Sequence, residues 1–173
     1  ARMPGTLLVH SAAQLCTVPP HDGGLQRGAA LGDLGVIEDG AVLIAAGEIV
    51  EVGETSSLRA RVQADREIDA SGRVVCPGFV DPHTHVVWMG DRAEEFERRV
   101  AGASYMEIMA AGGGIMATVR ATRAASVRSL VDATRPRLDC MLRLGTTTVE
   151  AKTGYGLATD AEVRELQAIA ELS

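Results

Sequence analysis

Pro77-Gly78-Phe79-Val80-Asp81-Pro82-His83-Thr84-His85 is the stretch of sequence that most constrains the fold. Residues 79–83 predict a short strand, and alternate side chains of a strand share one face. His83 and His85 are two residues apart, so their imidazoles point the same way. Two neutral imidazoles on one side suit Zn²⁺, Fe²⁺ or a similar ion, and a catalytic site needs a further protein ligand and an open position for water. A chance pair of histidines is the alternative, because this spacing alone is weak evidence.

Residues C-terminal to this stretch alternate between helix and strand patterns. Residues 126–144 predict a helix that Pro136 kinks or splits and that Gly145 ends as a C′ glycine. Its apolar positions recur with a 3.6-residue period and are Val127, Leu130, Val131, Leu138, Met141 and Leu142. Residues 146–152 predict the next strand, and Asp160 is the expected N-cap of another helix. Strand, helix, strand, helix is typical of a parallel α/β fold.

Residues 1–77 contain short β-like runs and no helix of substantial length. The predicted strands are residues 6–9, 41–46, 48–52 and 73–76. Gly47 joins the second and third as a tight hairpin would, and prolines and glycines around His21 predict a loop. We therefore predict an α/β chain with a small β-sandwich-like domain over 1–77 and the first βα units of a (β/α)₈ barrel over 78–173. Such a barrel needs about 250 residues, and the last predicted helix reaches Ser173 without a cap, so we expect the barrel to be incomplete in this chain.

Composition excludes several classes of partner. The chain has 173 residues, a formal net charge of −6 and 3% aromatic residues, with no conspicuous Lys/Arg run, which argues against nucleic acid and membrane partners. The three cysteines, Cys16, Cys76 and Cys140, form no CxxC pair, so neither a disulfide framework nor a cysteine zinc site is expected. Reduced thiols fit a cytoplasmic protein.

Three separate motifs resemble the imidazolonepropionase family of the amidohydrolase superfamily. They are PGFVDPHTHVVWMGDRAEEFERR from residue 77, GASYMEIMAAGGGIMATVRATR from residue 102 and TTTVEAKTGYGL from residue 146. The resemblance is dense over 74–160 and looser over 1–73. It implies a metal-dependent hydrolase barrel with one divalent ion, zinc or iron. His83 and His85 would hold this ion together with a later His and a later Asp, both beyond Ser173.

Three side chains are candidates for binding substrate. Arg92, seven residues after His85, is an anion clamp by its chemistry, since a guanidinium binds a carboxylate through two hydrogen bonds, and the family's pattern places a substrate-binding arginine here. A solvated arginine paired with Asp91 or Glu94 is the alternative. The resemblance makes Tyr155, in a strand-to-helix loop, a substrate contact rather than a turn tyrosine. Tyr105 is a weaker candidate, because it could equally begin a helix and pack its ring.

Other polar residues have structural or supporting interpretations. Asp81 has the same strand parity as the histidines and could support them, or be a solvated charge at a strand end. Glu150 and Lys152 should point to the inside of the barrel, and we prefer a buried polar or ion-pair role for Lys152 over metal bridging. Residues 111–114 lack the phosphate-binding glycine patterns and predict a flexible loop near the active site.

By resemblance, the whole protein would hydrolyse the cyclic amide of 4-imidazolone-5-propanoate to N-formimino-L-glutamate in histidine degradation. Its partner would be a small-molecule substrate that bears a carboxylate, and we leave a homodimer of the whole protein open. Two alternatives remain: another amidohydrolase, either a cyclic-amide hydrolase or a ring deaminase, and a non-catalytic degenerate barrel that only binds ligand. No catalytic acid or base is assigned in this segment, and we expect no hydrolase activity from the chain alone.

Overall fold

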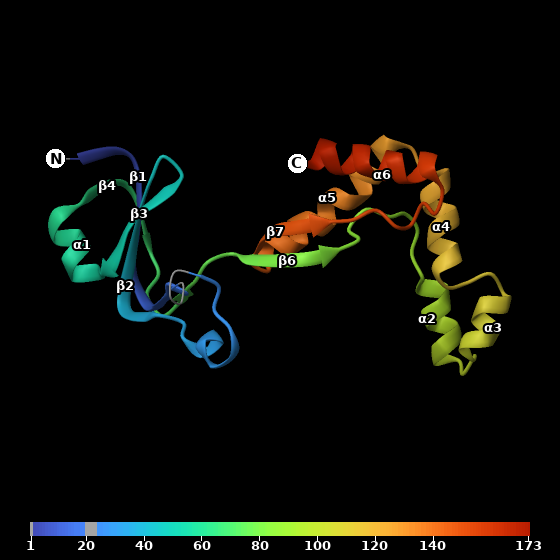
Figure 1. The fold of residues 1–173 in the computed structure, drawn as a ribbon, viewed down its shortest axis with the longest axis horizontal. Coiled ribbons are helices and arrows are strands. Elements are labelled where there is room, and N and C mark those ends of the chain that lie inside the picture. Colours follow the sequence, from blue (N-terminus) through green and yellow to red (C-terminus); the bar gives the residue numbers. More distant parts are fainter. Residues whose placement is uncertain (1, 20–23) are drawn as a thin grey trace. The chain divides into compact units, whose positions relative to one another are not determined.

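Residues 2–19 and 24–173 are described by the computed structural model, in which the chain divides into two units, Ala1–Pro77 and Gly78–Ser173 (Figure 1). The loop predicted around His21 lies outside the described residues. Each unit has its own sheet and its own buried apolar cluster.

A five-stranded mixed sheet forms the first unit. Its strands are β1 (Arg2–Cys16), β2 (Val36–Ala45), β3 (Glu48–Glu54), β4 (Gln63–Asp69) and β5 (Val74–Val75). The main order is β3-β2-β1-β4, and β5 pairs with β1 as well. The long central strand β1 runs antiparallel to β2 and parallel to β4 and β5. All four predicted strands are present in this sheet, although the sequence pattern revealed only part of β1.

The β2–β3 hairpin confirms the tight turn predicted at Gly47. Ala45 pairs with Glu48, so Ala46 and Gly47 alone make the turn. Both have positive φ, 53° and 83°, as a type I′ turn requires. Gly47 adopts this conformation at little cost, whereas Ala46 accepts some strain.

One helix covers this sheet where the sequence predicted none. Helix α1 (Thr55–Arg61) follows β3 and buries Leu58 against a cluster of Leu8, Leu43 and Ala41. A short 3₁₀ helix, η1 (Gly28–Gly32), buries no residue. Within the described part of the unit the strands form one sheet, and helix α1 packs against it. The β-rich prediction is confirmed, and the sandwich-like arrangement stays a prediction.

Two adjacent parallel strands, β6 (Phe79–Thr84) and β7 (Thr146–Ala151), begin the second unit's α/β arrangement. Phe79 pairs with Thr146 and Thr84 with Ala151, which confirms the parallel pairing expected from the sequence. Helix α5 (Val127–Arg143) lies between them in the chain, and α6 (Thr159–Leu172) follows β7.

The core of this unit lies between the strands and helices α5 and α6. Its fully or nearly buried members are Val86, Val87, Leu130, Val131 and Ala168. Ala151 packs against this cluster, as the strand parity of β7 predicted for its aliphatic side. The polar face of the same strand, with Glu150, is therefore turned away from the helices.

Two details of the predicted helices change. Helix α5 is one continuous helix through Pro136 rather than two short helices, because a proline removes one backbone hydrogen bond and the packed apolar face retains the rest. Gly145 follows its C-cap with φ +99°, which confirms the predicted helix end. The expected N-cap at Asp160 is wrong. Ala158 occupies that position, and Asp160 lies in the first turn of α6, where it accepts a hydrogen bond from Arg164 at 3.0 Å.

Three further helices lie within residues 93–124, where the sequence pattern predicted no regular structure. They are α2 (Ala93–Val100), α3 (Tyr105–Ala110) and α4 (Ile115–Ala124). Ser104 and Glu107 form a reciprocal capping box at the start of α3. Residues 111–114, predicted to be a flexible loop, form the whole connection between α3 and α4, and their flexibility stays a prediction.

No helix in the described part of the chain is long and apolar enough to cross a membrane. All three cysteines are free thiols: Cys16 is buried, and Cys76 and Cys140 are exposed.

Candidate metal and substrate site

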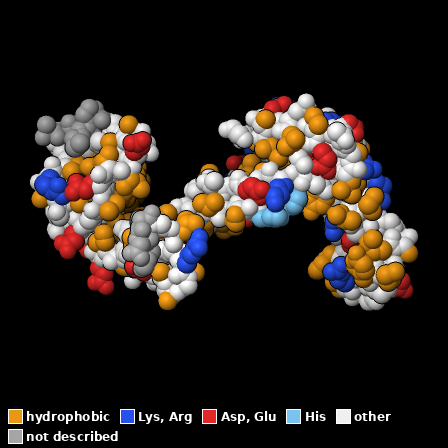
Figure 2. All heavy atoms as spheres, viewed as in Figure 1, with side chains coloured by type: hydrophobic (Ala, Val, Ile, Leu, Met, Phe, Trp, Pro, Cys, Tyr) orange, Lys and Arg blue, Asp and Glu red, His pale blue; other side chains and the backbone are white. Residues whose placement is uncertain are grey.

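Two histidines stand together at the carboxyl end of β6. The ring centroids of His83 and His85 are 5.7 Å apart, with the planes at 69°. Both side chains are exposed, and the histidines form one patch beside a basic and an acidic side chain on this face of the unit (Figure 2). Asp81 accepts a hydrogen bond from the backbone N–H of His83 at 3.2 Å, so it supports the strand end through the backbone.

The carboxyl end of β7 places Lys152 next to His83 and Glu150 next to Lys152. The Nζ atom of Lys152 lies 3.1 Å from Nδ1 of His83 and 3.7 Å from a carboxylate oxygen of Glu150. The Lys152 side chain is 41% exposed and forms this ion pair, which is the second of the two roles expected from the sequence. Its backbone N–H donates to the carbonyl of Thr84 at 2.8 Å, which ties the two strand ends together.

The loop after β7 packs against His85. The half-buried ring of Tyr155 lies edge-on to the imidazole of His85, with centroids 5.9 Å apart. Gly154 passes so close that a Cβ there would be 2.9 Å from two ring atoms of His85. His85 therefore lies between His83 and Tyr155.

Two glutamates of α6 face this loop. Glu165 is fully buried and accepts a hydrogen bond from the N–H of Gly154 at 3.3 Å. Burial raises the pKa of Glu165, and the negative charge of Glu162 adds to the rise, while the backbone N–H groups of Gly154 and Tyr155 oppose it. Burial also acts to raise the pKa of Glu162, but hydrogen bonds from the Thr153 side chain and from two backbone N–H groups hold that pKa below its usual value.

Arg137 of α5 fixes the segment that follows His85. Its Nη1 donates to the carbonyls of Val86 and Trp88 at 3.2 and 3.0 Å, and its guanidinium lies 3.6 Å from the centroid of the Trp88 ring. Burial lowers the pKa of Arg137, in keeping with a guanidinium partly withdrawn from water. Arg137 of α5 therefore holds in place the segment that leads from His85 to Arg92.

Replacing Arg137 by Met should loosen this connection while keeping an unbranched side chain. The loss of two charge-assisted hydrogen bonds and one cation–π contact is expected to lower the free energy of unfolding by about 1–3 kcal/mol. Trp88 is the only tryptophan of the chain, so its fluorescence should shift to the red and become more accessible to acrylamide. Arg135→Met, at an exposed position of the same helix, is the control. Unchanged emission in the Arg137 variant would contradict the clamp.

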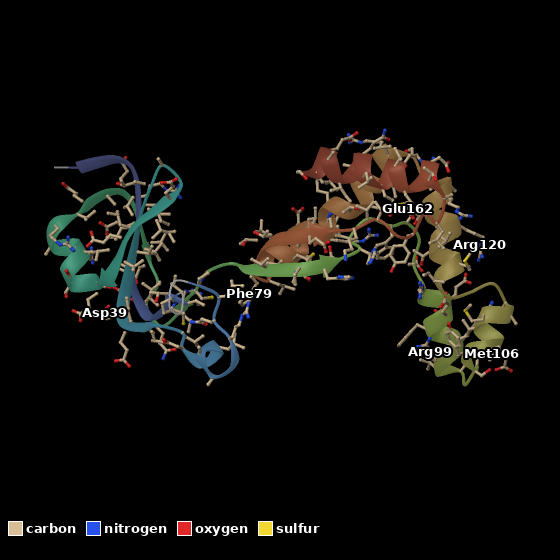
Figure 3. All side chains as sticks on the ribbon, in the orientation of Figure 1. Asp39, Phe79, Arg99, Met106, Arg120 and Glu162 are labelled. Carbon is tan, nitrogen blue, oxygen red and sulfur yellow. The ribbon has the colours of Figure 1, made fainter. Side chains whose placement is uncertain are left out.

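Arg92 lies elsewhere in this unit. It is the exposed N-cap residue of α2, and its Nε donates to the hydroxyl of Thr118 at 3.2 Å. Among the described residues it forms no ion pair with Asp91 or Glu94. It lines a cavity of about 320 Å³ whose described lining includes Arg98 and Arg120 but not the two histidines or Tyr155. Arg120 is labelled on α4 in Figure 3.

Tyr105 begins α3, as one of its two interpretations expected, but the residue is 63% exposed and does not pack into the core. It is also absent from the described lining of the cavity beside Arg92. Over residues 2–19 and 24–173, no group of three or more His, Cys, Asp or Glu side chains could hold a metal ion. His83 and His85 thus bring two nitrogen donors, of a type that suits zinc or iron, and a complete site needs more.

Comparison with known proteins decides the family. The model of the Amidohydrolase family matches residues 66–133. The imidazolonepropionase of Chloroflexus aggregans is 60% identical over 171 residues, which is 98% of this chain and 39% of that protein. The imidazolonepropionase of Herpetosiphon aurantiacus is 58% identical over 85% of this chain and 34% of that protein.

The chain belongs to the amidohydrolase family. It spans about two fifths or less of the length of the curated relatives it matches. Among solved amidohydrolase-fold structures, E. coli guanine deaminase matches with a TM-score of 0.64 at 20% identity, over 95% of this chain and 34% of that one. A zinc-bound adenosine deaminase from Xanthomonas campestris matches with a TM-score of 0.58 at 24% identity, over 93% and 31%. The α/β fold class predicted from the sequence is that of these amidohydrolases.

Sequence reasoning missed two supporting side chains of this amidohydrolase unit. Glu165 shares a buried helix face with Ala161 and Ala168, and a carboxylate on such a face is unusual enough to be a signal. Arg137 lies within a predicted helix and gave no comparable signal. The structure joins His83, His85, Lys152 and Tyr155 in one place, while the roles of Arg92 and Tyr105 stay predictions.

Proposed function

We propose that the whole protein is an imidazolonepropionase that hydrolyses the ring amide of 4-imidazolone-5-propanoate to N-formimino-L-glutamate in histidine degradation. The observation that carries this proposal is 60% identity to a relative of that name over 98% of the chain. The histidine pair at the carboxyl end of a parallel strand supports it, because that end of the strands is where barrel enzymes of this type build their active sites.

His83 and His85 are proposed to hold one divalent metal ion, zinc or iron, together with ligands from the rest of the protein. A zinc-bound structural relative supports a divalent ion in this fold. When bound, such an ion lowers the pKa of a water molecule and so supplies a nucleophile near neutral pH. An ammonium group only donates hydrogen bonds, so Nδ1 of His83 is the acceptor when the Lys152 ammonium donates to it across 3.1 Å. The carboxylate of Glu150 is the acceptor that can keep Lys152 beside the site when His83 binds metal.

The substrate side of the proposal rests on charge and hydrogen bonding. Hydrolysis adds one water across the ring amide, breaks its C–N bond and leaves a carboxylate and an N–H group. The propanoate tail needs a cation, and Arg92 offers a guanidinium. Among the described residues, this guanidinium donates a hydrogen bond only to the neutral hydroxyl of Thr118. Tyr155 would contact the substrate ring from beside His85, and Tyr105 is a weaker candidate for the same task.

Ring deamination is the second candidate, because two of the structural relatives are deaminases. Their identity to this chain is 20–24%, which establishes the fold alone. Non-catalytic binding is less well supported, because both histidines are present and adjacent.

The test is turnover by the whole protein loaded with zinc or with iron. We expect 4-imidazolone-5-propanoate to be consumed and N-formimino-L-glutamate to appear by mass spectrometry, with no ammonia released from guanine or adenosine. Ammonia release from either nucleobase compound without ring opening of the imidazolone would favour the deaminase. Tight binding of the imidazolone without either product would favour a binding protein.

A further inference from the structure

The loop between β7 and α6 is held by polar contacts along its backbone. Glu165 accepts a hydrogen bond from the N–H of Gly154 at 3.3 Å. The backbone N–H of Tyr155 also interacts with this carboxylate and lowers its pKa. Glu162, one turn earlier on α6 and labelled in Figure 3, accepts from the N–H of Leu157 at 2.6 Å and interacts with that of Gly156. Two carboxylates of one helix thus engage four successive backbone N–H groups.

The carbonyl groups of this loop are engaged from the other side. Arg123 of α4 donates from Nε to the carbonyl of Gly156 at 2.5 Å and from Nη2 to that of Leu157 at 2.7 Å. Arg164 of α6 donates in turn to the carbonyl of Arg123 at 2.9 Å. A loop with its N–H and carbonyl groups both bound has little freedom to move.

Glu165 is the member of this set that packing alone does not explain. It is fully buried, on the helix face that also buries Ala161 and Ala168. Its Oε1 has no hydrogen-bond partner among the described residues. An apolar side chain of similar size would avoid the cost of burying a carboxylate with one unsatisfied oxygen. What the carboxylate provides is an acceptor for the backbone at Gly154 and Tyr155, the two residues that lie against His85.

We propose that Glu165 is a positioning residue, whose buried carboxylate holds the Gly154–Tyr155 backbone so that Tyr155 lies against His85. Gly154 makes the geometry strict, because a backbone displaced towards the imidazole would collide with it and one displaced away would withdraw the tyrosine ring. The part of the proposal that concerns substrate rests on the proposed function. The part that concerns the loop is independent of it.

Hydrogen exchange of the loop amides, measured on the chain by NMR or mass spectrometry, tests the holding role. Glu165→Met keeps an unbranched side chain of similar length but has neither carboxylate oxygen, so the backbone N–H groups lose their acceptor, whereas Gln could keep its carbonyl oxygen in that place. Exchange at Gly154 and Tyr155 should accelerate by about tenfold or more, while Gly156 and Leu157 change by less than about twofold. Glu162→Met should give the reverse pattern, and Glu171→Met, at an exposed position of the same helix, should change neither.

Unchanged exchange at Gly154 and Tyr155 in Glu165→Met would overturn the proposal. If that variant exchanges rapidly throughout α5 as well, it has unfolded, and Glu165→Asp then decides the question. Asp keeps the charge and is one methylene shorter, so it should accelerate the same two amides. A folded Asp variant with protected amides would also refute the holding role.

Kinetics on the whole protein test the positioning of Tyr155. Glu165→Met should lower kcat/KM by about tenfold with full metal content, because a misplaced contact residue costs orientation. In a Tyr155→Phe background the same change should cost less than about twofold further, since coupled residues are not additive. Additive losses would refute the positioning role even if the loop is held. If the wild type does not turn over the imidazolone, the proposed function fails, and the exchange experiment still decides the role of Glu165 in holding the loop.

Discussion

The whole protein with His83→Ala or His85→Ala is expected to purify without its metal ion and without hydrolase activity. The two imidazoles lie together at one strand end and are proposed to supply two ligands, and the ligands that remain could not hold the ion in the same geometry. Even loss of a residue that only supports a ligand lowers metal affinity by about 10- to 100-fold, so loss of a ligand should lower it by at least that. Metal content by inductively coupled plasma mass spectrometry, with turnover on the same sample, measures both effects.

The control for the histidine variants is His10→Gln. His10 is buried in the first unit, 3.5 Å from Glu67, and has no part in the proposed site. This variant should retain one metal ion per chain even if it is less stable. Stoichiometric metal and normal turnover in both the His83 and His85 variants would refute the site.

Arg92→Ala in the whole protein should lower kcat/KM by about 10- to 100-fold while metal content stays intact, because a charge-assisted hydrogen bond contributes roughly 1.5–3 kcal/mol. If the contact with the flexible tail acts equally on the ground and transition states, its loss raises KM. If the contact orients the ring, its loss lowers kcat. Arg92→Lys should recover only part of the loss, since an ammonium lacks the planar fork. Steady-state kinetics with the imidazolone give kcat and KM for the wild type and for the Ala and Lys variants of Arg92.

Thr118→Val separates a binding role of Arg92 from a structural one. Thr118 accepts a hydrogen bond from the Arg92 Nε in the present structure. If that contact merely anchors α2 to α4, the Thr118 and Arg92 variants should lose similar stability and keep their activity. A kcat/KM for Arg92→Ala within about twofold of wild type would remove Arg92 from the site.

The parallel strands and long helices could be predicted because their sequence patterns agree with their surroundings. Helix α5 has a sustained apolar period, and its helical face packs in the core as that period requires. Strand β6 is short, but proline, glycine and the alternating histidines mark both its limits and its face. The turn at Ala46–Gly47 was signalled by the glycine that its backbone needs.

The remainder of the fold could not be predicted for reasons that differ from place to place. Helix α2 has eight residues, and its two large apolar side chains, Phe96 and Val100, are both exposed, so its apolar pattern is too short to be recognised as a period. Helix α3 has six residues, too few for a period, although its capping box was a local signal. At the site, the contact between His83 and Lys152 joins residues 69 positions apart. Strand parity indicated which way Lys152 points, but only the register of β6 against β7 determines which side chain it meets.

The parallel pairing of β6 with β7 also bears on the order of folding. Helices α2 to α5 all lie between the two strands in the chain, and each needs only local contacts to begin forming. The strands must instead close a long loop before any of their contacts is gained, and this entropic cost slows non-local pairing. We therefore expect the helices to gain structure first and the strands to pair late. During synthesis both histidines would leave the ribosome well before Lys152 and Tyr155, so the candidate site would be among the last parts of the unit to take shape.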